Sequence, residues 1–213
     1  MQQLRERQLF LKQAMQDLHE VGSVVPSSQA TAKAMTAAFR QRTKPARVLE
    51  VGAGTGPITA RLVKELRPGD FLDVYEINPD YSAFLARRFE QEPDFKAVRE
   101  QVALHTADIL EIEKEPQYDF IISAVPFTAF PATAVSNFFE TYRQILKPNG
   151  VLTYIEFAFG RHVMKVMTRE AAEKARIRAV AEIVDRYVEK YQFKHKFVLL
   201  NAPPARIRSL RFQ

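Results

Sequence analysis

Short apolar runs alternate with amphipathic stretches through the middle of the chain, from Ala46 to about Phe157. Four of the runs have the length and the Val, Ile and Phe content of buried strands. They lie at residues 48–51, 71–76, 104–110 and 118–127. Strands that alternate with helical stretches predict an α/β fold, with a mostly parallel sheet and helices on both of its faces.

The two ends of the chain add helices and a hairpin to this sheet. Leucines and Met15 recur on one face of residues 2–19, with Arg and Lys between them, which predicts a basic amphipathic helix. The further elements expected are a helix over 29–42, a long charged helix over 168–191, and an antiparallel pair of strands at 193–200 and 206–212. The pair would give the sheet an antiparallel strand at its C-terminal edge. We therefore expect an N-terminal helical cover or membrane-contact segment, residues 1–42, and a sheet domain, residues 43–213.

The segment Val48–Gly56 carries the clearest chemistry. Three of the seven glycines of the chain lie in it at every second position, after an apolar run and before an expected helix over 57–66. Glycine permits positive φ and lets a ligand approach more closely than a Cβ atom would. The pattern predicts a nucleotide-binding turn, with contacts from Glu50, Gly52, Ala53, Gly54, Thr55 and Gly56.

Two residues of this turn argue against a dinucleotide. In the fingerprint G-x-G-x-x-G the pyrophosphate lies on free N–H groups at a helix N-terminus. Here the third glycine comes one residue early, and Pro57, which follows it, has no N–H group. The carboxylate of Glu50 would repel a diphosphate but suits a cation. S-adenosylmethionine (SAM), with its sulfonium and ammonium groups, is such a ligand.

Acidic residues at the ends of the next two strands suit the adenosine half of this ligand. Glu76 ends the second strand, where a carboxylate can accept hydrogen bonds from both ribose hydroxyls. Asp108 lies at the end of a short third strand within residues 104–110, where it is placed either to accept a hydrogen bond from an exocyclic amine or to cap a helix. Neighbouring residues complete the predicted adenosine contacts: Ile77, Asn78, Ile109 and Leu110.

The motif E-x-G-x-G-x-G, followed by these acids, resembles the class I SAM-dependent methyltransferases. The resemblance implies a Rossmann-like sheet, SAM as cofactor with S-adenosylhomocysteine as product, and adenine N6 as the amine that Asp108 binds. It also implies cofactor contacts before the second helix and after the fourth strand, from Val25, Ser27, Ser28, Ser123, Ala124, Val125 and Pro126. Members that methylate planar nitrogens usually carry Asn or Asp and then Pro-Pro-Tyr at the fourth strand. Ser123 and Val125 depart from that pattern and disfavour a nucleic-acid substrate.

Three further motifs narrow the resemblance. They are G-x-V-x-P-S-S before the glycine turn, S-x-x-P-F after the fourth strand, and N-x-P-P-A-R-I-R near the end of the chain. Together they look like the bacterial phospholipid N-methyltransferases, which are similar to ribosomal RNA adenine dimethylases. The resemblance implies methylation of phosphatidylethanolamine towards phosphatidylcholine by a cytoplasmic protein, peripheral on the inner face of the cell membrane.

Such a reaction needs a neutral amine, and therefore a proton acceptor or a desolvating pocket near the acceptor. The candidates near expected strand ends or in the N-terminal cover are His19, Tyr142, Tyr154, Glu156 and His162. A cation is also needed for the lipid phosphate, with Arg161, Lys165, Arg206 and Arg208 as candidates.

Composition adds limits rather than a mechanism. A net charge of +6 and a pI near 9.5 suit an anionic membrane surface or a nucleic acid. The chain has no cysteine, and its four histidines have no metal-ligand spacing, so no metal site is expected. A monomer is expected. Four alternatives stay open: an RNA or DNA adenine methyltransferase, a methyltransferase for another aminolipid or small amine, a noncatalytic SAM-binding membrane adaptor, and, disfavoured by Glu50 and Pro57, an NAD-dependent oxidoreductase.

Overall fold

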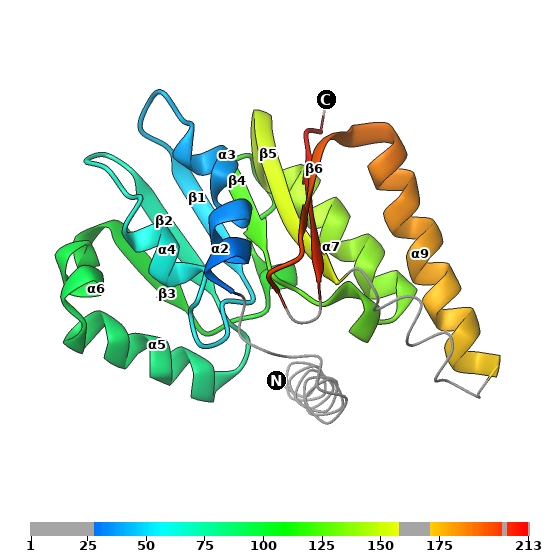
Figure 1. The fold of residues 1–213 in the computed structure, drawn as a ribbon, viewed down its shortest axis with the longest axis horizontal. Coiled ribbons are helices and arrows are strands. Elements are labelled where there is room, and N and C mark those ends of the chain that lie inside the picture. Colours follow the sequence, from blue (N-terminus) through cyan, green and yellow to red (C-terminus); the bar gives the residue numbers. More distant parts are fainter. Residues whose placement is uncertain (1–27, 158–170, 202–203, 213) are drawn as a thin grey trace.

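The computed structural model describes residues 28–157, 171–201 and 204–212, and these build one seven-stranded sheet with helices on both faces (Figure 1). The strands are β1 (Arg47–Val51), β2 (Phe71–Tyr75), β3 (Val102–His105), β4 (Tyr118–Ser123), β5 (Leu146–Phe157), β6 (Gln192–Val198) and β7 (Ala205–Leu210). Two helices precede β1: α2 (Gln29–Met35) and α3 (Ala37–Arg40). Between the strands lie the helices α4 (Thr59–Val63), α5 (Pro79–Gln91), α6 (Pro93–Ala97), α7 (Ala132–Ile145) and α9 (Ala171–Tyr191), and the short 3₁₀ turns η1 (Arg99–Gln101), η2 (Ile109–Glu111) and η3 (Phe127–Ala129).

The strand order is β3-β2-β1-β4-β5-β7-β6. The first five strands run parallel, while β7 is antiparallel to both β5 and β6. The predicted α/β class with an antiparallel strand near the C-terminal edge is confirmed, and β6 is the strand at that edge. The carboxyl ends of β1, β2, β3 and β4 therefore meet along one edge of the sheet, where open α/β sheets bind ligands.

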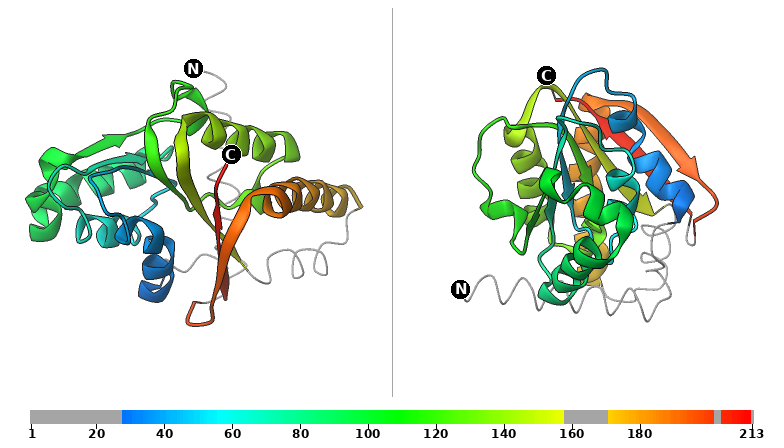
Figure 2. Two further views of the ribbon diagram at one scale, coloured as in Figure 1. Left: turned by 90° about the horizontal axis from the view of Figure 1, so that it is seen from above. Right: turned by 90° about the vertical axis from the view of Figure 1, so that its left-hand side faces the viewer.

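Helices cover both faces of the sheet (Figure 2). Alternating residues of the strands are therefore buried in two separate cores, one on each face. Val48 of β1 belongs to a core with residues from α2 to α6, and its neighbour Leu49 belongs to a core with α7 and α9. This alternation follows from the two-residue period of a strand whose two faces are both covered. None of the helices in the described residues is long and apolar enough to cross a membrane.

The helix expected over 29–42 is divided in two at Thr36. The divide is local, because Thr36 N–H still donates to Ala32 O (3.0 Å) and Arg40 N–H donates to Thr36 O (2.9 Å). Met35 and Phe39 are 1% exposed and lie in the same core as Val48. Residues 28–42 thus pack into the core of the sheet domain. The amphipathic helix expected over 2–19 lies outside the described residues.

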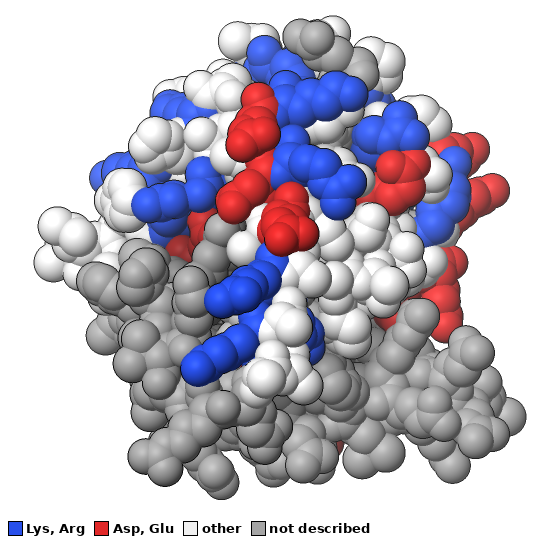
Figure 3. Space-filling model, turned by 90° about the vertical axis from the view of Figure 1, so that its right-hand side faces the viewer, with Lys and Arg blue, Asp and Glu red and all other residues white. Residues whose placement is uncertain are grey.

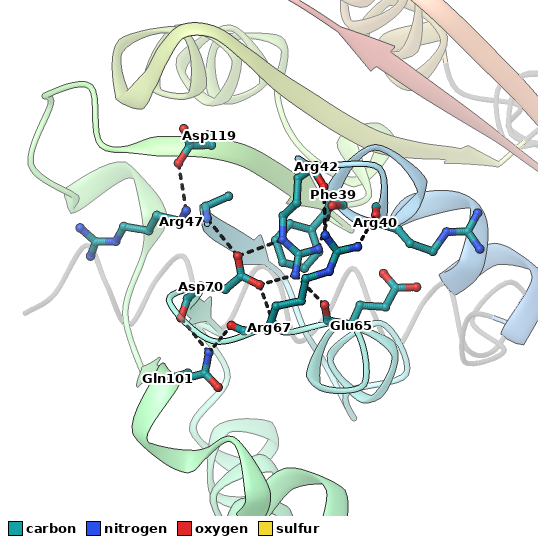
Figure 4. Close-up of polar contacts among 10 residues, drawn as sticks. Phe39, Arg40, Arg42, Arg47, Glu65, Arg67, Asp70, Gln101 and Asp119 are labelled. Atoms are coloured by element: carbon teal, nitrogen blue, oxygen red, sulfur yellow. Dashed lines mark hydrogen bonds and ion pairs between the residues drawn. The ribbon is translucent and has the colours of Figure 1, made fainter. Parts of the chain in front are cut away.

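A buried ion pair fixes the end of α3 to the loop before β2 (Figure 4). The Arg42 guanidinium donates to both carboxylate oxygens of Asp70 and to the carbonyls of Phe39 (2.9 Å) and Glu65 (2.7 Å). Asp70 also accepts from the backbone N–H groups of Ala46 (2.9 Å) and Arg67 (2.6 Å). Every strong donor and acceptor of the pair therefore has a partner, as a buried ion pair requires.

Candidate cofactor-binding site

The glycine turn lies where β1, β2 and β4 end side by side. Gly52, Gly54 and Gly56 have φ values of +75°, +57° and +81°, a region that favours glycine. Gly52 N–H donates to Tyr75 O of β2, and Ala124 N–H donates to Val51 O of β1, both at 2.9 Å. These bonds extend the sheet ladder past the strands and fix the turn at the ligand-binding edge. The predicted glycine conformation is confirmed.

The three glycines differ in what surrounds them. A Cβ atom on Gly56 would lie 2.5 Å from Leu85 Cδ2 and 2.9 Å from a guanidinium nitrogen of Arg88, so this glycine serves packing. A Cβ atom on Gly54 would meet nothing within 4 Å. Gly54 therefore leaves an open approach to the backbone, as a bound cofactor requires.

We expect Gly54→Ala to reduce SAM affinity at least about tenfold, because its methyl group would occupy this approach. The positive φ adds about 1 kcal/mol of strain. Gly69→Ala is the matched control, since Gly69 also has positive φ (+87°) but precedes β2 at the opposite edge of the sheet. Titration calorimetry with SAM separates the two variants. Equal affinity of Gly54→Ala and wild type would show that the approach is not used.

Glu76 connects the glycine turn to the turn after β2. It is 3% exposed, and its two carboxylate oxygens accept from Gly54 N–H (2.7 Å) and Asn78 N–H (2.8 Å). Burial raises the pKa of Glu76, and these backbone hydrogen bonds lower it in part. A carboxylate oxygen can accept more than one hydrogen bond. Glu76 can therefore hold the turn and still accept from ribose hydroxyls.

Glu50 is fully buried below the turn, on the face of the sheet that α4 covers. Burial raises its pKa to about 8, an effect that Thr59 and Arg88 reduce and that Glu76 increases. Among the described residues, neither carboxylate oxygen has a partner with good hydrogen-bond geometry, although the hydroxyl and the backbone N–H of Thr59 lie close enough to lower the pKa of Glu50. A buried carboxylate without a charged partner costs folding free energy. A bound cation would remove that cost, and no described residue of the protein supplies one. The site thus suits the charged methionine half of SAM.

Asp108 takes the second of the two roles predicted for it. Its side chain accepts from Leu110 N–H (2.9 Å) and caps η2. Ile109 is buried and Leu110 is half-buried in the core on the α7 side. The cap holds Asp108 at the end of β3, in the same row of strand ends as Glu76. A bond to adenine N6 stays a prediction.

The loop after β4 adjoins the glycine turn, as predicted. A Cβ atom on Gly52 would lie 3.5 Å from Val125 N and 3.6 Å from the carbonyl carbon of Ala124. The Ser123 hydroxyl is fully buried and shares a 3.0 Å hydrogen bond with the Tyr142 hydroxyl. Tyr142 is itself 0% exposed, and burial raises its pKa. This placement gives Ser123 and Tyr142 a part in packing rather than in proton transfer.

Two other acceptor-side candidates lie near the end of β5. The Tyr154 ring is 1% exposed and packs 5.4 Å from the Phe127 ring, between centroids. Glu156 accepts from Arg208 Nε at 2.8 Å, and Arg208 also donates to Gln192. Arg208 is thereby engaged, whereas the Arg206 Nε has no hydrogen-bond partner among the described residues. His19, Val25, Ser27, Arg161, His162 and Lys165 lie outside the described residues.

Sequence reasoning missed two residues that support this site. Arg88 of α5 donates to the carbonyls of Thr55 (2.9 Å) and Gly56 (3.1 Å) and so supports the glycine turn from outside. In the sequence it shows only the spacing of an ordinary helical ion pair with Glu92. Asn201 is buried and accepts from Ser28 N–H (3.0 Å) and the Thr31 hydroxyl (2.9 Å). Ser28, expected as a cofactor contact, caps α2 at this point.

Comparisons with known proteins agree with this geometry. Residues 48–150 match the family described as methyltransferase domain. An ornithine lipid N-methyltransferase from Singulisphaera acidiphila is 34% identical over 108 residues, which cover 51% of this chain and 56% of the relative. A ribosomal RNA small subunit methyltransferase A from Synechococcus is 32% identical over 83 residues, 39% of this chain and 26% of the relative. The chain thus spans about half or less of these curated relatives.

Solved structures share the fold over nearly the whole chain. The O-methyltransferase from Bacillus cereus, in complex with S-adenosylhomocysteine, has a TM-score of 0.63 at 14% identity and covers 95% of this chain and 90% of its own. The O-methyltransferase TomG from Streptomyces achromogenes, in complex with SAM, has a TM-score of 0.64 at 16% identity and covers 96% and 90%. The sheet, the glycine turn and the family match lead to one conclusion: residues 48–150 of this chain form a methyltransferase domain, on a fold shared with SAM-bound methyltransferases, and SAM is the cofactor that this match supports.

Proposed function

We propose that the protein transfers methyl groups from SAM to the primary amine of a lipid head group, phosphatidylethanolamine in the first place, at an anionic membrane surface. The observation that carries the proposal is that the glycine turn, with the buried Glu50 carboxyl, lies next to an apolar, aromatic region after β4. We call this region the acceptor side, because the methyl acceptor would bind there. Ser123, at the position of the planar-amine clamp, is bonded to Tyr142, and Phe127 and Tyr154 pack beside it. The 34% identical relative that methylates ornithine lipids supports an aminolipid acceptor.

The residues of the site would act by binding and by excluding water. Glu76 and Gly54 would hold the ribose half of SAM, and Glu50 would face its cationic half. When bound, SAM supplies an activated methyl group, which a neutral amine attacks in line. The new N–C bond forms as the S–C bond breaks, and the amine proton leaves to solvent. Aromatic rings such as Phe127 and Tyr154 favour the neutral amine by desolvation and attract the methylated ammonium product.

The direct test supplies labelled-methyl SAM to three acceptors at matched salt: phosphatidylethanolamine vesicles, ornithine lipid vesicles and ribosomal RNA. The proposal predicts label in phosphatidylethanolamine, with mono-, di- and trimethylated products resolved by mass spectrometry. Label in ornithine lipid alone would keep the aminolipid class and change the head group. Label in RNA alone would replace the proposal with nucleic-acid methylation. SAM binding without transfer to any of the three would indicate an adaptor.

The Glu50 carboxyl makes SAM binding depend on pH. With a pKa of about 8 it is mostly protonated in the free protein at neutral pH, whereas a cation favours its ionised form. We expect SAM affinity to rise about tenfold per pH unit up to about pH 8, with a proton released on binding. Calorimetry in buffers of different ionisation enthalpy measures that release.

Glu50→Gln is the control for this pH dependence, because it removes the titrating carboxyl and keeps its shape. The SAM amino group titrates near pH 8 in both proteins, so only the difference between them reports on Glu50. A raised native pKa means that Glu50 costs stability as pH rises from about 4.5 to about 8. The variant should therefore be more stable than wild type above pH 8. The same slope in both proteins would exclude Glu50 from cation binding.

A further inference from the structure

The turn between β6 and β7 exposes two adjacent leucines. Leu199 and Leu200 are 77% and 83% exposed, more than any other large hydrophobic side chain in the described residues. Single exposed apolar residues are ordinary on protein surfaces. Two adjacent leucines at the tip of a turn, however, expose enough apolar surface to favour binding to another surface or aggregation. They call for a partner that buries them.

The tip lies at the same edge of the sheet as the cofactor turn. Ala205, which follows the tip, pairs with Val198 of β6 and with Phe157, the last residue of β5. Because β5 runs parallel to β4 and β1, its end and the tip share the carboxyl edge (Figure 1). A surface that covers the tip would therefore face the acceptor side of the cofactor site.

The residues on both sides of the two leucines, Val198 and Asn201, are held by the rest of the domain. The Asn201 side chain, next to Leu200, is 5% exposed and accepts hydrogen bonds from Ser28 N–H and the Thr31 hydroxyl at the start of α2. Val198, on the other side of the leucines, is buried in the core. Because both flanks are fixed, the two leucines project without a large loss of backbone entropy on binding.

The charge around the tip favours an anionic partner. Residues 192–200 hold Lys194, His195 and Lys196 and no acid, and both lysines are exposed. The Arg206 guanidinium lies 4.4 Å from the centre of the Phe197 ring. The side formed by α9 differs, because Asp and Glu lie among its Lys and Arg side chains (Figure 3). Lysines along an edge strand also oppose pairing with a second copy of the strand.

We propose that the β6–β7 tip docks on an anionic lipid bilayer, with Leu199 and Leu200 in the acyl boundary and Lys196 among the head groups. Apolar insertion beside cations is the usual basis of interfacial binding. The inference rests on the proposed function, for which it supplies the contact that turns the cofactor edge towards lipid.

The chain contains no tryptophan, so one introduced residue reports insertion by its fluorescence. We expect Leu200→Trp to show a blue-shifted emission with phosphatidylglycerol–phosphatidylcholine vesicles and little shift with phosphatidylcholine alone. Phe193→Trp is the matched control. Phe193 is 50% exposed on the same strand and also lies beside a cation, Arg211, but it is near the start of β6, far from the tip. Absence of a shift for Leu200→Trp, or an equal shift for both variants, would overturn the proposal.

A second measurement uses the apolar contact itself. Leu199→Ala/Leu200→Ala should reduce cosedimentation with the same anionic vesicles at least about tenfold, since each removed buried methylene weakens transfer into lipid. SAM affinity should not change. The emission of Leu200→Trp could also shift to the blue without vesicles, in proportion to protein concentration. If sedimentation then shows dimers, the tip serves self-association and not lipid binding. These vesicles contain no primary amine, so the binding experiment does not depend on methyl transfer. Membrane docking and lipid methylation can therefore each be contradicted without the other.

Discussion

Glu76→Ala should reduce SAM affinity at least about 100-fold, since it removes the carboxylate that both orders the glycine turn and can accept from ribose. Hydrogen bonds to charged groups contribute about 1.5–3 kcal/mol each, and the loss of two gives at least this factor. Glu76 accepts from Gly54 N–H and Asn78 N–H, so the turn also loses its tie to β2. Titration calorimetry with SAM measures the loss.

Glu140→Ala is the control for this experiment. Glu140 lies on α7 and pairs with Arg143 at the surface, so its removal should leave SAM affinity within about twofold of wild type. A thermal melt of each variant checks that the fold is retained. If folded Glu76→Ala binds SAM as wild type does, Glu76 does not belong to the site.

Arg42→Ala should lower the free energy of unfolding by about 3–5 kcal/mol, because it leaves the buried Asp70 carboxylate without its counter-ion. The side chains of Arg42 and Asp70 are 2% and 0% exposed. For a domain of this size the melting temperature should fall by at least about 6 °C. Chemical denaturation gives the free energy, and calorimetric melting gives the temperature.

Arg143→Ala is the matched control, since it breaks the exposed pair with Glu140 and should lower the free energy of unfolding by no more than about 1 kcal/mol.

The ion pair also makes stability depend on pH. The pKa of Asp70 is lowered, because the hydrogen bonds from Arg42 and two backbone amides outweigh the effect of its burial. This stability is present above the unfolded pKa of about 4 and is lost as pH falls through the lowered value. Equal losses for the two arginine variants would mean that the pair does not hold α3 in place.

The sequence predicted the sheet and its ligand edge well, for a physical reason. The strands β1, β2 and β4 are buried on both faces, so each appears as a short apolar run, and the glycines after β1 mark the turn. The sequence predicted Gly54 and Glu76 as separate contacts of one ligand, and the structure joins them by a hydrogen bond because parallel strands end at one edge of the sheet. The C-terminal hairpin was also predicted, because two stretches that mix apolar and basic residues flank a connection with two prolines.

Other features depend on contacts that no local pattern reports. The support of the glycine turn by Arg88 crosses 32 and 33 residues, and the bonds of Asn201 to Ser28 and Thr31 cross more than 160. Tyr142 was a candidate base because it is a titratable group near a strand end, yet its helix face turns it into the core. The complete burial of Glu50 was also unexpected, because the motif places it beside an open turn.

The central claim is that the turn after β1 binds SAM and not a dinucleotide. The measurement that tests it most directly is a calorimetric titration of the wild-type protein with SAM and with NAD under one set of conditions, followed by NAD in the presence of SAM. We expect SAM to bind with one-to-one stoichiometry and NAD to produce no heat in either titration. Saturable binding of NAD that SAM does not displace, with no binding of SAM, would contradict the claim.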